Sequence, residues 1–240
     1  MDDSDSTNKF AIHEAVREGK LLLVNHLVDE DGKLLFLKDD DGRIPLHWAC
    51  SGNNLEMVEI LVRERAGVKP YDMDELEDAS GWTPIHIAAS VGNPQILDLL
   101  MKASAETPDI DLVTGQGTTA LYLAISKNHY DVVRKLVDDY KCSCRVKDKK
   151  GLSPLHRAAS IGSQPIVKLL VEKGKVNVNA KDGQGWTSLH HALAEGHGDT
   201  AVLLVQLGAD PELANDDGEK PVQVAVDEKV ARFFVEHLRK

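Results

Sequence analysis

Histidine is the residue type in this sequence with the clearest potential for chemistry, because five copies recur at intervals of 34 to 39 residues, with one doubled interval of 70 between the third and the fourth: His13, His47, His86, His156 and His190. Neutral imidazole is the commonest metal ligand among side chains. In a stack of repeated units, however, successive copies lie about 10 Å apart, so no single ion reaches two of them. We therefore interpret these imidazoles as structural groups that bond to a helix-capping hydroxyl and to the backbone, and we expect no metal.

The remaining candidate sites are weaker. Two clusters of possible metal ligands lack the second close pair that a four-ligand site needs, namely Cys142 with Cys144, and His190–His191 with His197 and Asp199. The glycine pair Gly115 and Gly117 is not followed by the lysine of a phosphate-binding loop. Serine, histidine and aspartate residues are plentiful but not organised as a triad, so we expect no catalytic residue and no cofactor.

The histidines belong to a longer repeated pattern. The stretch GWTPIHIAA at 81–89 recurs as GRIPLHWA at 42–49, GLSPLHRA at 151–158 and GWTSLHHA at 185–192, with weaker copies at 117–124 and 218–225. We call the histidine place in this pattern the ruler position; it falls at 13, 47, 86, 122, 156, 190 and 223. Fourteen residues after it stands a leucine in six of the seven copies: Leu27, Leu61, Leu100, Leu136, Leu170 and Leu204.

A period near 33 residues is the ankyrin signature. The sequence therefore predicts an all-α solenoid of seven stacked helix-turn-helix units with β-hairpin fingers, in which the first and last units act as caps. The expected repeats are about 1–37, 38–76, 77–112, 113–146, 147–180, 181–213 and 214–240, in a single domain over 1–240. Met1–Lys9 is expected to be a frayed tail, and Leu55–Arg65 the second helix of the second repeat.

Composition narrows the function. The net charge is −11, which argues against a protein that grips nucleic acid through phosphates. Residues 1–120 hold 10 basic and 23 acidic side chains, whereas residues 121–240 hold 18 and 16, so we expect an acidic end that favours a basic partner surface.

No apolar run approaches the roughly 20 residues of a membrane span. The polar Met1–Asn8 lacks the apolar core of a secretory signal, and an intracellular soluble protein is expected.

Several stretches go beyond the generic pattern: DGRIPLHW at 41–48, SGWTPIHIAASVGN at 80–93, LHRAAS at 155–160 and LHHALAEGHGD at 189–199. With them the whole chain resembles the gankyrin family of ankyrin-repeat assembly chaperones of the proteasome regulatory particle, and its fungal members most of all. The resemblance implies a non-catalytic protein, cytoplasmic and nuclear and monomeric when free. It also implies a partner, the C-terminal helical domain of one ATPase subunit of the proteasome base.

The resemblance further implies a partner surface made of finger tips and first helices. Its aromatic and inner-helix positions map to Trp48, Trp82, Ile87, Arg157, Trp186 and His191, and its ion-pairing positions to Asp41, Arg43, Glu77, Asp78, Lys127 and Glu195. Exposed tryptophans are costly for a monomer, so an apolar strip rimmed by charge indicates binding. The structural alternatives are that Trp48 and Trp82 pack between repeats and that Arg157 pairs with a finger carboxylate.

Two interpretations remain open for the acidic stretch Ala66–Ser80, a solvated loop or a docking tip.

Two hypotheses also remain open for the function of the protein. The alternative to a proteasome chaperone is an ankyrin-repeat regulator or inhibitor of a kinase or transcription factor, which would use the same surface.

Overall fold

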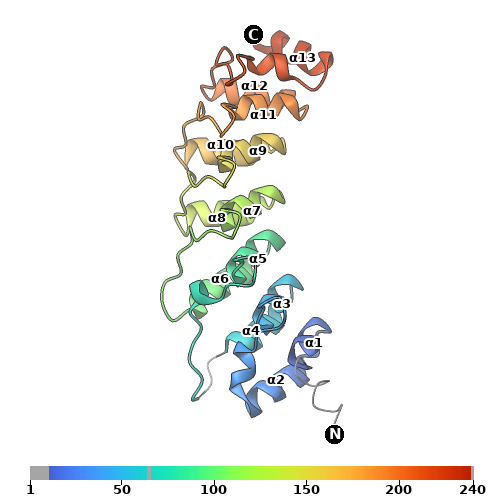
Figure 1. Cartoon of the computed structure of the whole chain (residues 1–240), viewed down its shortest axis with the longest axis vertical. Coiled ribbons are helices and arrows are strands. Elements are labelled where there is room, and N and C mark those ends of the chain that lie inside the picture. The colour runs from blue at the N-terminus through green and yellow to red at the C-terminus, as the bar shows by residue number, and fades with distance from the viewer. Residues whose placement is uncertain (1–10, 64–65, 239–240) are drawn as a thin grey trace. The chain divides into compact units, whose positions relative to one another are not determined.

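The computed structural model describes residues 11–63 and 66–238, and the chain divides into two compact parts, Met1–Gly115 and Gln116–Lys240 (Figure 1). The expected tail Met1–Lys9, and Arg65 at the expected end of a helix, lie outside the described residues. The seven repeat boundaries and the single-domain organisation stay predictions.

In the N-terminal part, short helices follow one another in pairs. They are α1 (Ala11–Arg17), α2 (Leu21–Glu30), α3 (Pro45–Ser51), α4 (Leu55–Val62), α5 (Pro84–Val91) and α6 (Pro94–Ala103), with 3₁₀ turns η1 (Gly32–Phe36) and η2 (Met73–Glu75). The first members α1, α3 and α5 pack in series, and so do the second members α2, α4 and α6.

The C-terminal part repeats this arrangement. Its elements are α7 (Ala120–Ser126), α8 (Tyr130–Asp138), α9 (Pro154–Ser160), α10 (Gln164–Glu172), α11 (Ser188–Ala194), α12 (Gly198–Gln206), η3 (Pro221–Val224) and α13 (Glu228–Leu238). The predicted helix pairs are thus confirmed. Pro45, Pro84 and Pro154 each open a first helix, where proline loses no needed N–H group.

The repeated apolar positions form the core, as the pattern predicts. The leucines fourteen residues after the ruler position are fully buried from Leu61 to Leu204, and the alanines two residues after it, Ala49 to Ala192, let first helices approach closely. Each fully buried leucine contributes about 1.5–3 kcal/mol relative to exposure. Leu27 is only half-buried; in the described part of the chain, α4 is the one second helix against which its helix α2 packs closely.

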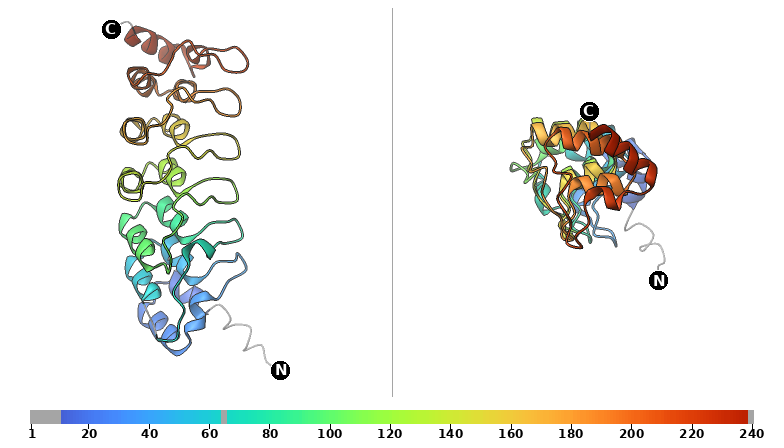
Figure 2. Two further views of the ribbon diagram at one scale, coloured as in Figure 1. Left: turned by 90° about the vertical axis from the view of Figure 1, so that its left-hand side faces the viewer. Right: turned by 90° about the horizontal axis from the view of Figure 1, so that it is seen from above.

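We use the word finger for the turn that precedes each first helix. The expected β-hairpins are reduced to tight turns: among the described residues there is no strand, and one antiparallel bridge joins Lys181 to Thr187. Five of the turns are closed by a backbone bond such as the one from Asp182 N to Trp186 O, 2.8 Å. Within each part the fingers extend to the same side of the helices (Figure 2).

Neighbouring finger tips are joined through main-chain atoms. Ala79 N donates to Asp41 O at 2.9 Å, and Gly183 N donates to Lys150 O at 3.2 Å. The glycine that completes each tip has positive φ, as at Gly151 (+79°) and Gly218 (+80°), a region where a Cβ carries a steric penalty. The tips of each part therefore form a ribbon held by backbone bonds.

The long segment 66–80 is only partly the solvated loop expected. Tyr71 and Met73 are buried, Ala105 N donates to Tyr71 O at 2.7 Å, and Met73 N donates to the Ser104 hydroxyl at 3.2 Å. The extra residues fold back onto the end of α6. Periodicity did not reveal this, because the segment has no counterpart in the other repeats.

The ruler imidazoles tie repeat to repeat. His156 Nδ1 accepts from the backbone N–H of Ser153 at 3.1 Å, and the Ser153 hydroxyl lies 2.7 Å from it. His156 Nε2 donates to the carbonyls of Ala180 and Trp186, 3.0 and 3.1 Å away in the next finger. The other ruler histidines reach the next finger in the same way, through Arg43 O, Leu76 O, Leu112 O and Glu219 O.

Two repeats depart from this arrangement. Tyr122 takes the ruler position in α7, and burial together with the charge of Asp148 raises its pKa to about 12. In the last repeat the first helix is the 3₁₀ turn η3, and the following α13 buries only Phe234 while Glu228, Lys229, Arg232 and Glu236 are exposed. The apolar Phe233, Val235 and Leu238 of the same helix are exposed as well, so α13 has only in part the polar outer side expected of a terminal cap.

Finger packing predicts unequal costs for two glycine substitutions with the same backbone strain. A Cβ at Gly151 would lie 2.7 Å from the Gly183 backbone nitrogen, whereas a Cβ at Gly218 would meet nothing within 4 Å. We expect Gly218→Ala to lower the unfolding free energy by about 1 kcal/mol and Gly151→Ala by about 3 kcal/mol or more. Urea titrations of both variants measure this, and equal losses would show that the fingers are not in close contact.

The imidazole ties predict acid sensitivity. Burial, and to a lesser extent the neighbouring His191, lowers the pKa of His156 to about 4; burial also lowers the pKa values of His47, His86 and His190. Unfolded histidine, with a pKa of 6.5, takes up protons that folded His156 does not. Its contribution to stability is therefore complete above pH 6.5 and falls as the pH drops towards 4.

From His156 alone we expect the unfolding free energy to drop by about 2 kcal/mol between pH 7 and pH 5, measured by urea titration at each pH. His156→Gln should lose less on acidification than the parent chain does. His26→Gln, at an exposed position of α2, is the control and should keep the parent slope. Stability unchanged down to pH 5 would contradict neutral, buried imidazoles.

Candidate functional site

The candidate surface is the finger face, which we define as the finger tips together with the first helices of each part. Four predicted ion-pairing residues lie exposed on it or at its edge: Asp41 and Glu77 in fingers of the N-terminal part, and Lys127 and Glu195 at the ends of α7 and α11. These four side chains are available to a partner.

Asp78 does not lie on the surface as expected. Its side chain is 3% exposed; Oδ1 accepts from the backbone N–H groups of Ser80 and Trp82, both at 2.9 Å, and Oδ2 accepts from Arg43 Nε at 3.0 Å. Burial opposes its ionisation, but these hydrogen bonds outweigh burial and hold the pKa of Asp78 below its usual value. Asp78 therefore builds its turn, and its carboxylate is not exposed as expected; its role towards a partner stays a prediction.

Trp48 is fixed in place on α3. Its indole Nε1 donates to Asp39 Oδ2 at 2.7 Å, and the guanidinium carbons of Arg17 and Arg43 lie 4.8 and 5.0 Å from the ring centroid. Cation–π contacts of this kind contribute about 0.5–1 kcal/mol at exposed sites. Burial works against ionised Asp39, yet the bonds from Trp48, Arg43 and Asp41 keep its pKa lowered.

The apolar strip is less exposed than expected. Trp48, Trp82 and Trp186 are all half-buried. Ile87 is only 5% exposed and is not the exposed side chain expected; its role towards a partner stays a prediction. Packing between repeats, the structural alternative, accounts for much of the tryptophan surface.

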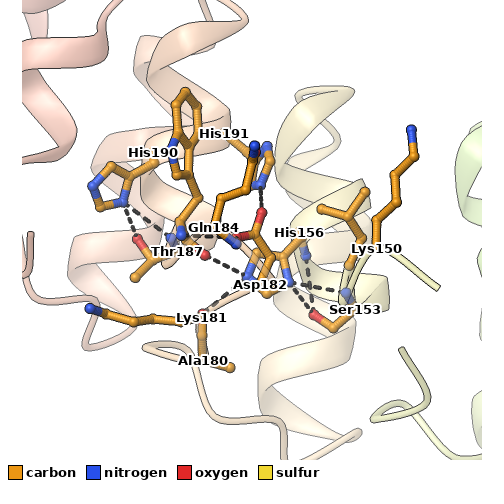
Figure 3. A network of polar contacts seen from close by, with 12 residues as sticks. Lys150, Ser153, His156, Ala180, Lys181, Asp182, Gln184, Thr187, His190 and His191 are labelled. Carbon is orange, nitrogen blue, oxygen red and sulfur yellow. Dashed lines mark hydrogen bonds and ion pairs between the residues drawn. The ribbon is translucent and has the colours of Figure 1, made fainter. Parts of the chain in front are cut away.

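In the C-terminal part, a polar cluster centres on Asp182 (Figure 3). Asp182 Oδ1 accepts from the backbone N–H groups of Gln184 and Trp186, both at 2.9 Å, and Oδ2 lies 2.8 Å from His191 Nε2. The His191 ring stands 5.3 Å from Trp186 and 5.5 Å from His156. Burial would raise the pKa of Asp182, but its hydrogen bonds lower it.

Arg157 is also held by the protein itself. Its Nε donates to the Ser126 hydroxyl of the preceding repeat at 3.0 Å, and that hydroxyl donates to Tyr122 O at 2.9 Å. The expected alternative, a bond to a finger carboxylate, is therefore replaced by a bond to a hydroxyl. Arg157 is half-buried.

Sequence reasoning missed the residue that shapes most fingers. An Asp or Asn eight places before the ruler position accepts two backbone N–H bonds in each of five turns, at Asp39, Asp78, Asp148, Asp182 and Asn215. Side chains of this type favour such turns. The constant offset was visible in the sequence. Arg17 was missed too, because nothing in the pattern marks its stack on Trp48.

The arrangement offers no activated nucleophile at the cluster around His156. The Ser153 side chain is buried, and both ring nitrogens of His156 are occupied by bonds to the backbone, so Asp182 does not orient that imidazole.

In residues 11–63 and 66–238, no group of three or more His, Cys, Asp or Glu side chains is placed to hold a metal ion. No helix within these ranges is long and apolar enough to cross a membrane.

Comparison with known sequences supports the repeat assignment directly. The chain matches the family described as "Ankyrin repeats (3 copies)" over residues 1–74, 66–148 and 140–215. It is 43% identical over 142 residues to "Probable 26S proteasome regulatory subunit p28" of Saccharomyces cerevisiae, a match that covers 59% of this chain and 60% of that protein.

A second relative, "Ankyrin repeat-containing protein C6C3.08" of Schizosaccharomyces pombe, is 35% identical over 130 residues, 53% of each protein. The chain thus spans between half and three fifths of the length of these curated relatives.

Solved structures agree with the fold. The ankyrin repeat domain of Bcl-3, described as a member of the IkappaB protein family, matches with a TM-score of 0.76 and 31% identity, covering 95% of this chain and 97% of that one. EF0377, an ankyrin repeat protein, matches with a TM-score of 0.69 and 22% identity over 81% of this chain and 96% of that one, a likeness of fold alone.

The repeat period, the finger-to-helix histidine bonds and the match along most of its length together place this chain in the ankyrin-repeat family.

Proposed function

We propose that this protein is a non-catalytic scaffold that acts as an assembly chaperone of the 26S proteasome regulatory particle. The observation that carries the proposal is its 43% identity over 142 residues to the yeast protein named as a probable 26S proteasome regulatory subunit. In this proposal it works in the cytoplasm and nucleus, and its partner is the C-terminal helical domain of one base ATPase subunit.

The finger face supports a binding role. Its aromatic and charged groups are already held in place by internal bonds, as Trp48 is by Asp39, Arg17 and Arg43. Because these side chains are already fixed, this protein loses less conformational entropy when a partner binds. Exposed Asp41 and Glu77 in the acidic N-terminal part, with Lys127 in the C-terminal part, would set orientation and association rate.

The alternative is a regulator or inhibitor of a kinase or transcription factor. The Bcl-3 ankyrin domain, 31% identical over nearly the whole chain, favours keeping it, because the same scaffold serves a protein outside the proteasome relatives. Both readings use the finger face, so only the identity of the partner separates them.

Titration with purified ATPase C-terminal domains tests the proposal. We expect one of them to form a one-to-one complex that changes tryptophan fluorescence, because Trp48, Trp82 and Trp186 are half-buried on the face and would be covered. Calorimetry gives the stoichiometry. If the folded protein binds none of these domains by either method, the chaperone proposal is wrong and the regulator reading takes its place.

Charge reversal at the finger tips should weaken that complex. The double variant Asp41→Lys/Glu77→Lys is expected to raise Kd about tenfold to a hundredfold, mainly through slower association, with the effect shrinking in high salt. Glu56→Lys/Glu59→Lys makes the same net charge change at exposed positions of α4 and should raise Kd by less than about threefold. Equal losses in the two variants would mean that net charge, and not the finger face, governs binding.

A further inference from the structure

The second helices of the C-terminal part carry a surface that the finger face does not use. We propose that the groove between α8 and α10 binds an acidic segment of a second protein, independently of the partner on the finger face. The groove has a volume of about 660 Å³ and is bordered by Tyr130, Arg134, Gly162, Gln164, Lys168 and Lys173, with Leu169 among its apolar contacts.

Two cations in this groove are not neutralised. Arg134 and Lys168 are exposed, and within the described part of the chain no carboxylate forms an ion pair with either. The third cation, Lys173, is paired with Asp138 at 2.7 Å. Each of the two unpaired cations stands twelve residues after a ruler position, so they occupy equivalent places on neighbouring helices.

The charge at these two positions is opposite to the charge at the equivalent positions of the N-terminal part. The equivalent positions in the N-terminal part are Glu59 on α4 and Asp98 on α6, and the whole chain carries a net charge of −11. The groove lies in residues 121–240, which hold 18 basic and 16 acidic side chains, whereas residues 1–120 hold 10 and 23, so an acidic ligand is attracted to the groove and repelled by the N-terminal half.

The lining favours a peptide with both acidic and apolar side chains. Tyr130 is 39% exposed and lies at the groove beside the buried Leu169, which offers an aromatic surface next to the two cations. Glu172 contributes a negative charge within the groove. A peptide can place its carboxylates near Arg134 and Lys168 and an apolar side chain against Tyr130. Such a peptide matches both the cations and the aromatic surface of the groove.

The groove is separate from the finger face. None of its lining residues belongs to a finger or to α7, α9 or α11, and in Figure 1 α8 and α10 lie on the other side of this part from α7 and α9. Both surfaces are therefore free to be occupied at once, and loss of one leaves the other intact.

A short fluorescein-labelled peptide of alternating glutamate and leucine blocks is the probe. Anisotropy should show salt-sensitive binding to the full chain, and NMR should place the largest amide shifts in Tyr130–Asp138 and Gln164–Glu172. Arg134→Glu/Lys168→Glu is expected to weaken binding at least about tenfold, while Glu172→Gln strengthens it about twofold. Circular dichroism establishes that the variants are folded.

Lys149→Glu/Lys150→Glu is the matched control, because it makes the same charge change at exposed finger positions of the same part. It should alter the peptide affinity by less than about twofold. The proposal is overturned if the parent chain does not bind the peptide, if the control weakens binding as much as the groove variant, or if the shifts map to the fingers.

Discussion

In four of the repeats one hydrogen-bonded group links the repeat to the next, the neutral imidazole at the ruler position. Its Nδ1 accepts from the start of its own helix and its Nε2 donates to the next finger, as His156 does to Ser153 and Trp186. A single side chain thus caps one helix and fixes the neighbouring turn. The finger-to-finger backbone bonds and the close alanine contacts depend on the spacing that this bridge sets.

The sequence predicted the scaffold because its signals are periodic. Equal spacing located the helix pairs, the buried leucines and the bridging histidines, and these were confirmed. The segment 66–80 was predicted poorly, since a non-repeating insertion has no second copy with which to compare Tyr71 and Met73. Periodicity identifies residues that occupy equivalent positions in different repeats, and the residues of an insertion have no equivalent position in another repeat.

The partner surface was harder to predict, for a different reason. Asp78 and Ile87 sit where partner residues were expected, but Asp78 turns inward to its own backbone and Arg43, and Ile87 is covered. The direction of the Asp78 side chain follows from its place in the turn, eight residues before the ruler position, and its charge does not reveal this. Asp41 and Glu77, which are exposed, belong to the same acidic fingers and were indistinguishable from Asp78 by charge alone.

The ribbon of finger tips has a consequence for how such a protein diverges. Its links, from Asp41 O to Ala79 N and from Lys150 O to Gly183 N, involve only main-chain atoms, so they are indifferent to the side chains that the tips carry. Those side chains can change from one relative to the next while the scaffold keeps its register. The side chains of the finger tips can therefore be randomised to select binding to new targets. The fold is kept as long as the finger glycines and the turn aspartates are left unchanged.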